Sequence, residues 1–97
     1  PMFMAEGYFT QKVLTQRLAS LEIPVDVRVL PALGSDPKLP QLMLDVAIAA
    51  AGQTGATPKE ARLLIVGHGS KIGPASADAT RAVARAIAGL GSFQCVE

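Results

Sequence analysis

The stretch LLIVGHGSKIGPASADAT, from Leu63 to Thr80, decides the fold prediction. It begins inside a continuous apolar run, ARLLIVG at 61–67, of the kind found in strands that are buried on both faces of a parallel sheet. The run stops at a glycine-flanked turn, and apolar residues then recur at helical spacing over about 76–88. The stretch therefore predicts a strand, a sharp turn and a helix in succession.

Further strands and helices are expected to alternate on both sides of this unit. Apolar or alternating patterns predict strands, and amphipathic spacing or capping residues predict helices. The strands are expected at 1–5, 25–30 and 93–97, a helix from a cap at Thr10 to Ile23, and another from a cap at Ser35 or Asp36, through Pro37, to about Ala51. The order β-α-β-α-β-α-β predicts the α/β class, with four parallel strands flanked by helices.

Composition excludes several classes of protein. The 97 residues suffice for one small domain, and a hydrophobic content of 49% argues against disorder. A net charge of +1 and 4% aromatic residues argue against binding to nucleic acid or a membrane surface. The sequence contains no run of about 20 apolar residues and no signal peptide, and its single cysteine fits a reducing compartment. We expect a cytoplasmic protein with a real core that includes Met2, Met4 and Met43.

Ligands of parallel sheets bind beyond the carboxyl ends of the strands, so the strand exits are the candidate site. Three exits follow from the predicted strands: Glu6–Phe9, Pro31–Ser35 and Gly67–Ser70. The third holds the only histidine, His68. Its flanking glycines permit a sharp turn and close backbone approach, and an imidazole can accept a proton or ligate a metal.

Other side chains near the exits each have two interpretations. Ser70 and Ser76 offer hydroxyls, and Lys71 and Arg81 could pair with carboxylates or phosphates or remain solvated. Tyr8 and Phe9 could line a pocket or pack on a helix, Glu6 could be a helix-entry anion or a pocket carboxylate, and Cys95 is expected to be buried rather than reactive. A purely structural role for His68 also stays open. One histidine cannot build a zinc cage, and a histidine at the centre of Gly-His-Gly does not fit a serine-hydrolase elbow.

Three stretches together resemble one family. LLIVGHGS (63–70), PMFMAEGYFTQKVLTQRL (1–18) and VRVLPALGSDPKL (27–39) are similar to segments of the class II, CbiX-like chelatases, the sirohydrochlorin cobaltochelatases and ferrochelatases of cobalamin and siroheme biosynthesis. The resemblance implies a three-layer α/β/α, flavodoxin-like fold, used in pairs with a tetrapyrrole cleft between the two halves.

The order of these segments differs from that of one family domain. Residues 1–57 resemble the C-terminal half of a repeat, and residues 58–97 resemble the N-terminal half. We therefore expect either the middle segment of a two-repeat protein or a permuted single unit, 1–97. The expected partner is a second chelatase-like half or a second copy in a homodimer.

The resemblance also implies roles for individual residues. His68 matches the family's metal ligand or proton acceptor, and Co²⁺ or Fe²⁺ would be the substrate metal, with no tightly bound cofactor. The tetrapyrrole-binding residues implied are Gly67, Gly69, Ser70, Lys71, Gly7, Tyr8 and Phe9. The family's usual second histidine is replaced here by Phe9, which can neither bind metal nor accept protons. The alternatives are therefore a degenerate, non-catalytic module that binds a tetrapyrrole or another anion, and a purely structural half.

Overall fold

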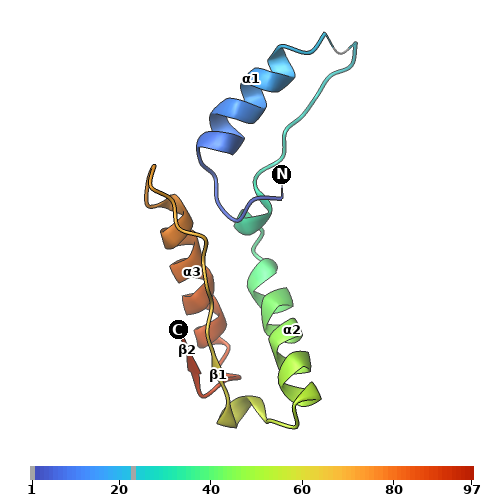
Figure 1. The fold of residues 1–97 in the computed structure, drawn as a ribbon. Coiled ribbons are helices and arrows are strands. Elements are labelled where there is room, and N and C mark those ends of the chain that lie inside the picture. Colours follow the sequence, from blue (N-terminus) through green and yellow to red (C-terminus); the bar gives the residue numbers. More distant parts are fainter. Residues whose placement is uncertain (1, 23) are drawn as a thin grey trace. The chain divides into compact units, whose positions relative to one another are not determined.

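The computed structural model describes residues 2–22 and 24–97 and divides the chain into two compact units, 1–36 and 37–97 (Figure 1). Unit 1 contains the helix α1, and unit 2 contains the helices α2 and α3 and the strands β1 and β2. The sequence analysis divided the chain at residue 57 for a different reason, because 1–57 and 58–97 resemble different halves of a repeat. That division stays a prediction.

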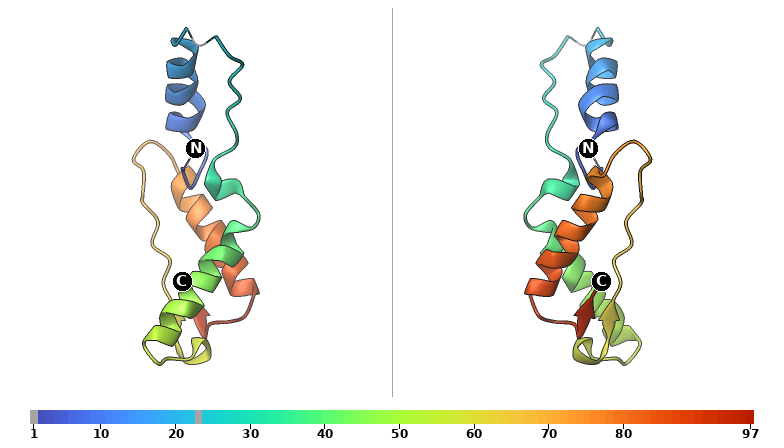
Figure 2. Two further views of the ribbon diagram at one scale, coloured as in Figure 1. Left: turned by 90° about the vertical axis from the view of Figure 1, so that its right-hand side faces the viewer. Right: turned by 90° about the vertical axis from the view of Figure 1, so that its left-hand side faces the viewer.

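Unit 1 is built around one helical segment. A π-helical turn, Phe9–Val13, continues into α1, Leu14–Ala19. The apolar residues at helical spacing, Val13, Leu14 and Leu18, are half-buried, whereas Gln16 and Arg17 are exposed. The segment 24–32 then runs back alongside α1 without regular structure, ending at a 3-10 turn, Leu33–Ser35 (Figure 2).

Several predictions for unit 1 are wrong in detail. The helix begins before Thr10, which lies inside its first turn, and it ends at Ala19; Ile23 lies outside the described residues. Residues 2–5 and 25–30 form no strand, because no neighbouring strand satisfies their backbone groups there. Met2 and Met4 are exposed rather than part of a core, while Met43 packs against the core of unit 2.

Unit 2 begins with α2, Leu39–Gln53, close to the predicted helix. Its N-cap position is occupied by Lys38 rather than by Ser35 or Asp36, and Pro40 rather than Pro37 lies in the first turn. Proline is tolerated there because the first N–H groups of a helix have no intrahelical acceptor. Within the described residues, no helix is long and apolar enough to cross a bilayer.

The strand and the helix predicted for Leu63–Thr80 are confirmed, as is the strand predicted after them, although both strands are shorter than predicted. β1 is Arg62–Leu63, α3 is Ala75–Gly89 and β2 is Cys95–Val96. The strands are parallel, with Arg62 opposite Cys95, and the Ile65 N–H donates to the Glu97 carbonyl at 2.8 Å. The described sheet has these two strands, so the four-stranded sheet remains a prediction.

The core of unit 2 lies between its two long helices and the strand pair. Leu44 of α2 and Val83 and Ile87 of α3 are almost fully buried, with β-strand and loop residues packed around them: Leu63, Ile65, Phe93 and Val96. Val83 and Ile87 lie four residues apart, so they share one face of α3. The strand 61–67 is shorter than predicted and is not buried on both faces, since Leu64 and Val66 are 69% and 83% exposed.

Candidate functional site

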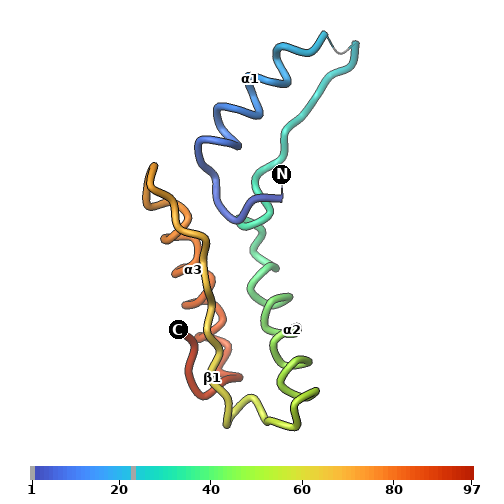
Figure 3. The backbone as a smooth tube through the Cα atoms, viewed as in Figure 1, coloured from blue at the N-terminus to red at the C-terminus, as the bar shows by residue number. Residues whose placement is uncertain are grey.

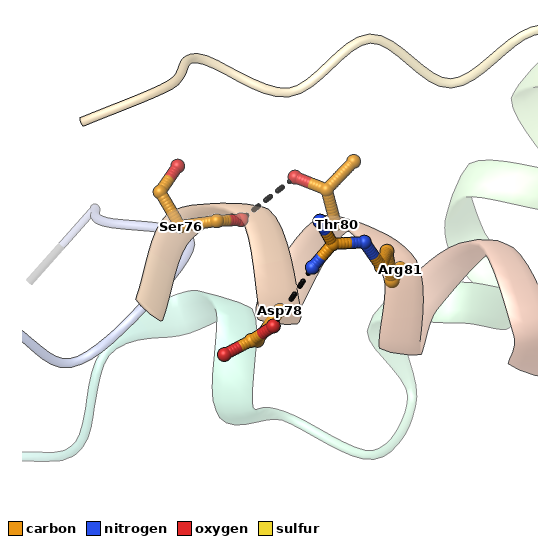
Figure 4. Close-up of polar contacts among 4 residues, drawn as sticks. All are labelled: Ser76, Asp78, Thr80 and Arg81. Atoms are coloured by element: carbon orange, nitrogen blue, oxygen red, sulfur yellow. Dashed lines mark hydrogen bonds and ion pairs between the residues drawn. The ribbon is translucent and has the colours of Figure 1, made fainter. Parts of the chain in front are cut away.

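The segment that carries His68 is held against the first turns of α3. The predicted sharp turn at Gly67–Ser70 is wrong, because residues 64–70 are irregular without a turn and the chain bends only at 71–72 and 74. From β1 the chain runs back along α3 as an irregular loop before the helix begins (Figure 3). The Ser76 hydroxyl donates a hydrogen bond to the His68 carbonyl. Gly67 lies against Thr80, whose hydroxyl donates to the Ser76 carbonyl at 2.9 Å (Figure 4). Two side chains of α3 therefore fix the backbone on either side of the histidine.

The His68 imidazole is exposed, and one of its nitrogens is already engaged. Nδ1 lies 2.9 Å from the carbonyl oxygen of Gly69. A carbonyl can only accept a hydrogen bond, so this contact places the proton of a neutral imidazole on Nδ1. Nε2 then carries the free lone pair, which is the atom that a metal ion or a transferred proton requires.

The polar residues that follow His68 differ in whether their side chains already form hydrogen bonds or ion pairs. The Ser70 hydroxyl oxygen accepts the Ile72 N–H at 3.1 Å, and the Lys71 side chain is exposed. Arg81 forms an ion pair with Asp78 at 2.9 Å on the surface of α3 (Figure 4). Between residues that the structure describes, Arg81 forms an ion pair and Lys71 forms none, so Lys71 offers a positive charge near His68 in the sequence.

Gly67 is expected to be intolerant of any side chain, whereas Gly69 is not. A Cβ at Gly67 would overlap the Thr80 side chain, but a Cβ at Gly69 would meet no atom within 4 Å. Overpacking of this kind costs ~1–3 kcal/mol. We expect Gly67→Ala to increase hydrogen exchange in the first turns of α3 by about tenfold or more, and Gly69→Ala to leave it unchanged. Equal exchange in the two variants would contradict the described packing of Gly67 against Thr80.

In unit 1 a carboxylate joins two of the predicted strand exits. Glu6 Oε1 accepts the Ala32 N–H at 2.5 Å, although the two residues are 26 positions apart. Thr10 bonds to Gly7 through its hydroxyl, and both Thr10 and Ala32 are buried. The Ala32 N–H, and to a lesser degree the Thr10 hydroxyl, lower the pKa of Glu6. Glu6 therefore links Glu6–Phe9 and Pro31–Ser35, and its two predicted roles, a helix-entry anion or a pocket carboxylate, stay predictions.

This link makes the stability of unit 1 dependent on pH. Because the pKa of Glu6 is lower in the folded chain than its ordinary value of 4.5, the carboxylate stabilises unit 1 above that value. The stabilisation is lost as the pH falls through the lowered pKa.

The only tyrosine is Tyr8, so its fluorescence during urea unfolding reports on unit 1 alone. We expect Glu6→Gln to lower the midpoint at neutral pH and to reduce its loss on acidification, whereas the exposed control Glu22→Gln should match the unmodified chain.

The aromatic residues beyond this link form a small exposed cluster. The rings of Phe3 and Phe9 are parallel with centroids 6.3 Å apart, and Tyr8 meets Phe9 edge-on at 5.8 Å. The Lys12 ammonium lies 5.7 Å from the centre of the Tyr8 ring. Tyr8 and Phe9 are 50% and 58% exposed, so their side chains are not buried by the cluster. Phe3 and Lys12 were not predicted for the site, and their only sequence signal was that both lie close to Tyr8 and Phe9.

The predicted site residues thus fall into two groups, each organised within its own unit. Gly67, His68, Gly69, Ser70 and Lys71 belong to unit 2, and Gly7, Tyr8 and Phe9 belong to unit 1. Among residues 2–22 and 24–97, no three His, Cys, Asp or Glu side chains gather where they could hold a metal ion. Cys95 is half-buried, and its thiol lies 3.4 Å from Glu97. The roles of the two groups of predicted site residues in binding and chemistry stay predictions.

The chain is similar to a solved structure of CbiX, the terminal enzyme for biosynthesis of siroheme in denitrifying bacteria. The two share 40% sequence identity over 98% of this chain, with a TM-score of 0.81. The chain spans 42% of the length of that CbiX chain. No protein-family model and no curated protein matches the sequence. The similarity confirms both the α/β class and the predicted resemblance to CbiX-like chelatases.

Proposed function

The chain is CbiX-like in sequence and fold, and from that premise we propose that it contributes to metal insertion into a tetrapyrrole. The substrate would be sirohydrochlorin and the metal Co²⁺ or Fe²⁺, supplied as a substrate rather than as a resident cofactor. The observation that carries this proposal is the exposed His68 imidazole, whose Nδ1 is occupied and whose Nε2 is open.

His68 would act through Nε2 in one of two ways. Metal insertion requires the metal to lose its waters and the macrocycle to lose two pyrrole protons. A neutral imidazole can hold the entering ion, or it can accept a pyrrole proton as a general base. The bond from the Ser76 hydroxyl to the His68 carbonyl supports either role, because it holds the backbone that carries the imidazole.

The remaining predicted residues would bind the macrocycle rather than react with it. The Lys71 ammonium suits a carboxylate of sirohydrochlorin through a charge-assisted hydrogen bond, as does the hydroxyl hydrogen of Ser70. Gly67 and Gly69 allow the backbone to approach the ligand closely. The half-exposed Tyr8 and Phe9, beside Gly7, offer aromatic faces that favour stacking on a planar ring.

A second candidate function is binding without insertion. Phe9 occupies the position of the usual second histidine of the family that the chain resembles. A phenylalanine can neither bind a metal nor act as a base. A degenerate module of this kind would still bind a tetrapyrrole or another anion. Another half or a second copy could alternatively supply the missing base to a catalytic protein.

Binding and insertion can be separated in one experiment on the full-length protein. Metal-free sirohydrochlorin is first titrated with protein, and Co²⁺ or Fe²⁺ is then added while the absorbance bands of the metal-free ring are followed. We expect binding followed by insertion faster than in buffer. Binding with insertion no faster than in buffer would favour the non-catalytic module, and absence of binding would contradict both functions.

A further inference from the structure

Two hydrogen bonds meet at the backbone that carries the His68 ring. The Ser76 hydroxyl of α3 donates to the His68 carbonyl, and the imidazole Nδ1 donates to the next carbonyl along the chain, that of Gly69, at 2.9 Å. The His68 carbonyl belongs to the planar peptide group that joins His68 to Gly69. Because Ser76 holds this peptide group from outside, it also restricts where the chain can place the Gly69 carbonyl.

The segment is attached to α3 at two points. Ser76 and Thr80 lie four residues apart, on the same side of α3 (Figure 4). Gly67 lies against the Thr80 side chain, and the adjacent His68 is held through its carbonyl by Ser76. The backbone is therefore fixed as far as the His68 carbonyl.

Gly69 has no comparable restraint of its own. A Cβ there would meet no atom within 4 Å, and glycine lacks the side chain that limits the backbone angles of other residues. The next hydrogen bond along the chain, from the Ile72 N–H to the Ser70 hydroxyl, is formed within the segment 69–73 itself. The position of the Gly69 carbonyl therefore depends on the peptide group before it, which Ser76 holds.

The Gly69 carbonyl matters because it selects between two neutral forms of the ring. A neutral imidazole carries its proton on Nδ1 or on Nε2, and the hydrogen bond at one nitrogen decides which form predominates. The His68 ring is exposed, so water can bond to either form. Only the form that is protonated on Nδ1 can donate to the Gly69 carbonyl and keep the lone pair on Nε2.

We propose that Ser76 is a positioning residue that selects the tautomer of His68. Its hydroxyl holds the peptide group 68–69 against α3, which keeps the Gly69 carbonyl within reach of Nδ1 and leaves the Nε2 lone pair free. Loss of one hydrogen bond of this kind changes an equilibrium by about two- to tenfold. The choice of tautomer depends on these contacts alone, and its effect on metal insertion rests on the proposed function.

Nitrogen NMR of the imidazole measures the tautomer directly. The protein is prepared with isotopically labelled histidine and studied at about pH 9, where an ordinary histidine is neutral. Signals that disappear in His68→Ala belong to His68. We expect the form protonated on Nδ1 to predominate in the unmodified protein, and Ser76→Ala to shift the ratio toward protonation of Nε2 by about two- to tenfold. Ser76→Thr, which keeps a hydroxyl, should keep the ratio.

Loss of helical structure would not explain such a shift. Alanine is the best helix former, so the intrinsic preference of α3 for a helix is not reduced in Ser76→Ala. Ser20→Ala is the matched control, because the Ser20 hydroxyl also donates to a backbone carbonyl, that of Arg17, at 2.7 Å, but lies in unit 1. We expect Ser20→Ala to leave the tautomer ratio unchanged.

The rate of Co²⁺ insertion by Ser76→Ala separates this inference from the proposed function. We expect insertion to slow in proportion to the loss of the form protonated on Nδ1, with tetrapyrrole binding unchanged. A tautomer shift in Ser76→Ala without insertion by the unmodified protein would refute the proposed function and still support the role of Ser76. An unchanged tautomer ratio in Ser76→Ala, or an equal shift in Ser20→Ala, would overturn the role of Ser76 whatever the insertion rates.

Discussion

The variant Gly34→Ala is expected to unfold unit 1 far more easily than the unmodified chain. A Cβ at Gly34 would overlap the backbone carbonyl of Met4, which cannot rotate away as a side chain can. The same glycine donates its N–H to the Phe3 carbonyl at 2.9 Å, so the two segments cannot separate without losing this bond. Overpacking typically costs ~1–3 kcal/mol, and a clash with backbone lies at the upper end.

Tyr8 fluorescence measures this effect because it reports on unit 1. We expect Gly34→Ala to lower the urea midpoint sharply and to raise hydrogen exchange of the α1 amides by about 100-fold. Gly7→Ala is the matched control, since a Cβ there meets no atom within 4 Å. If both variants unfold like the unmodified chain, the close approach of Gly34 to Met4 is wrong.

The sequence predicts an element well where the element satisfies its own backbone. The predicted helix at about 76–88 is observed as Ala75–Gly89, because its hydrogen bonds are internal and its apolar side, at Val83 and Ile87, packs on the core. Strands depend on a neighbour instead. The alternating residues 25–30 have the strand pattern but no paired strand among the described residues, and β1 is paired only where β2 lies beside it.

The candidate site shows the same contrast between local and distant causes. The place of His68 between a strand and a helix followed from adjacent residues, and the structure places His68 beside the first turns of α3 with the imidazole exposed; the bend itself lies at 71–72 and 74 rather than at the glycines. The bond from Glu6 to Ala32 joins residues 26 apart, and no periodicity or spacing signals such a contact. The stack of Phe3 on Phe9 likewise depends on how the chain bends at Gly7.

Replacement of His68 is the second change with a large expected effect, on activity rather than on stability. The ring is exposed and is hydrogen-bonded to the carbonyl of the adjacent Gly69, so His68→Ala removes no buried packing. It does remove the one imidazole of the chain, and with it the open Nε2. Loss of a general acid–base group typically slows a reaction by ~10²–10⁴-fold. Arg81→Gln is the control, because its guanidinium forms an ion pair with Asp78 on the surface of the same helix, α3.

The rate of Co²⁺ insertion into sirohydrochlorin, compared between the full-length protein and its His68→Ala variant, tests the central claim most directly. The absorbance of the metal-free macrocycle is followed at saturating substrate, with binding measured separately in the absence of metal. We predict that insertion by His68→Ala falls to the rate in buffer, while tetrapyrrole binding and the activity of Arg81→Gln are retained. Insertion by His68→Ala at the rate of the unmodified protein would contradict the assignment of the chemistry to this imidazole.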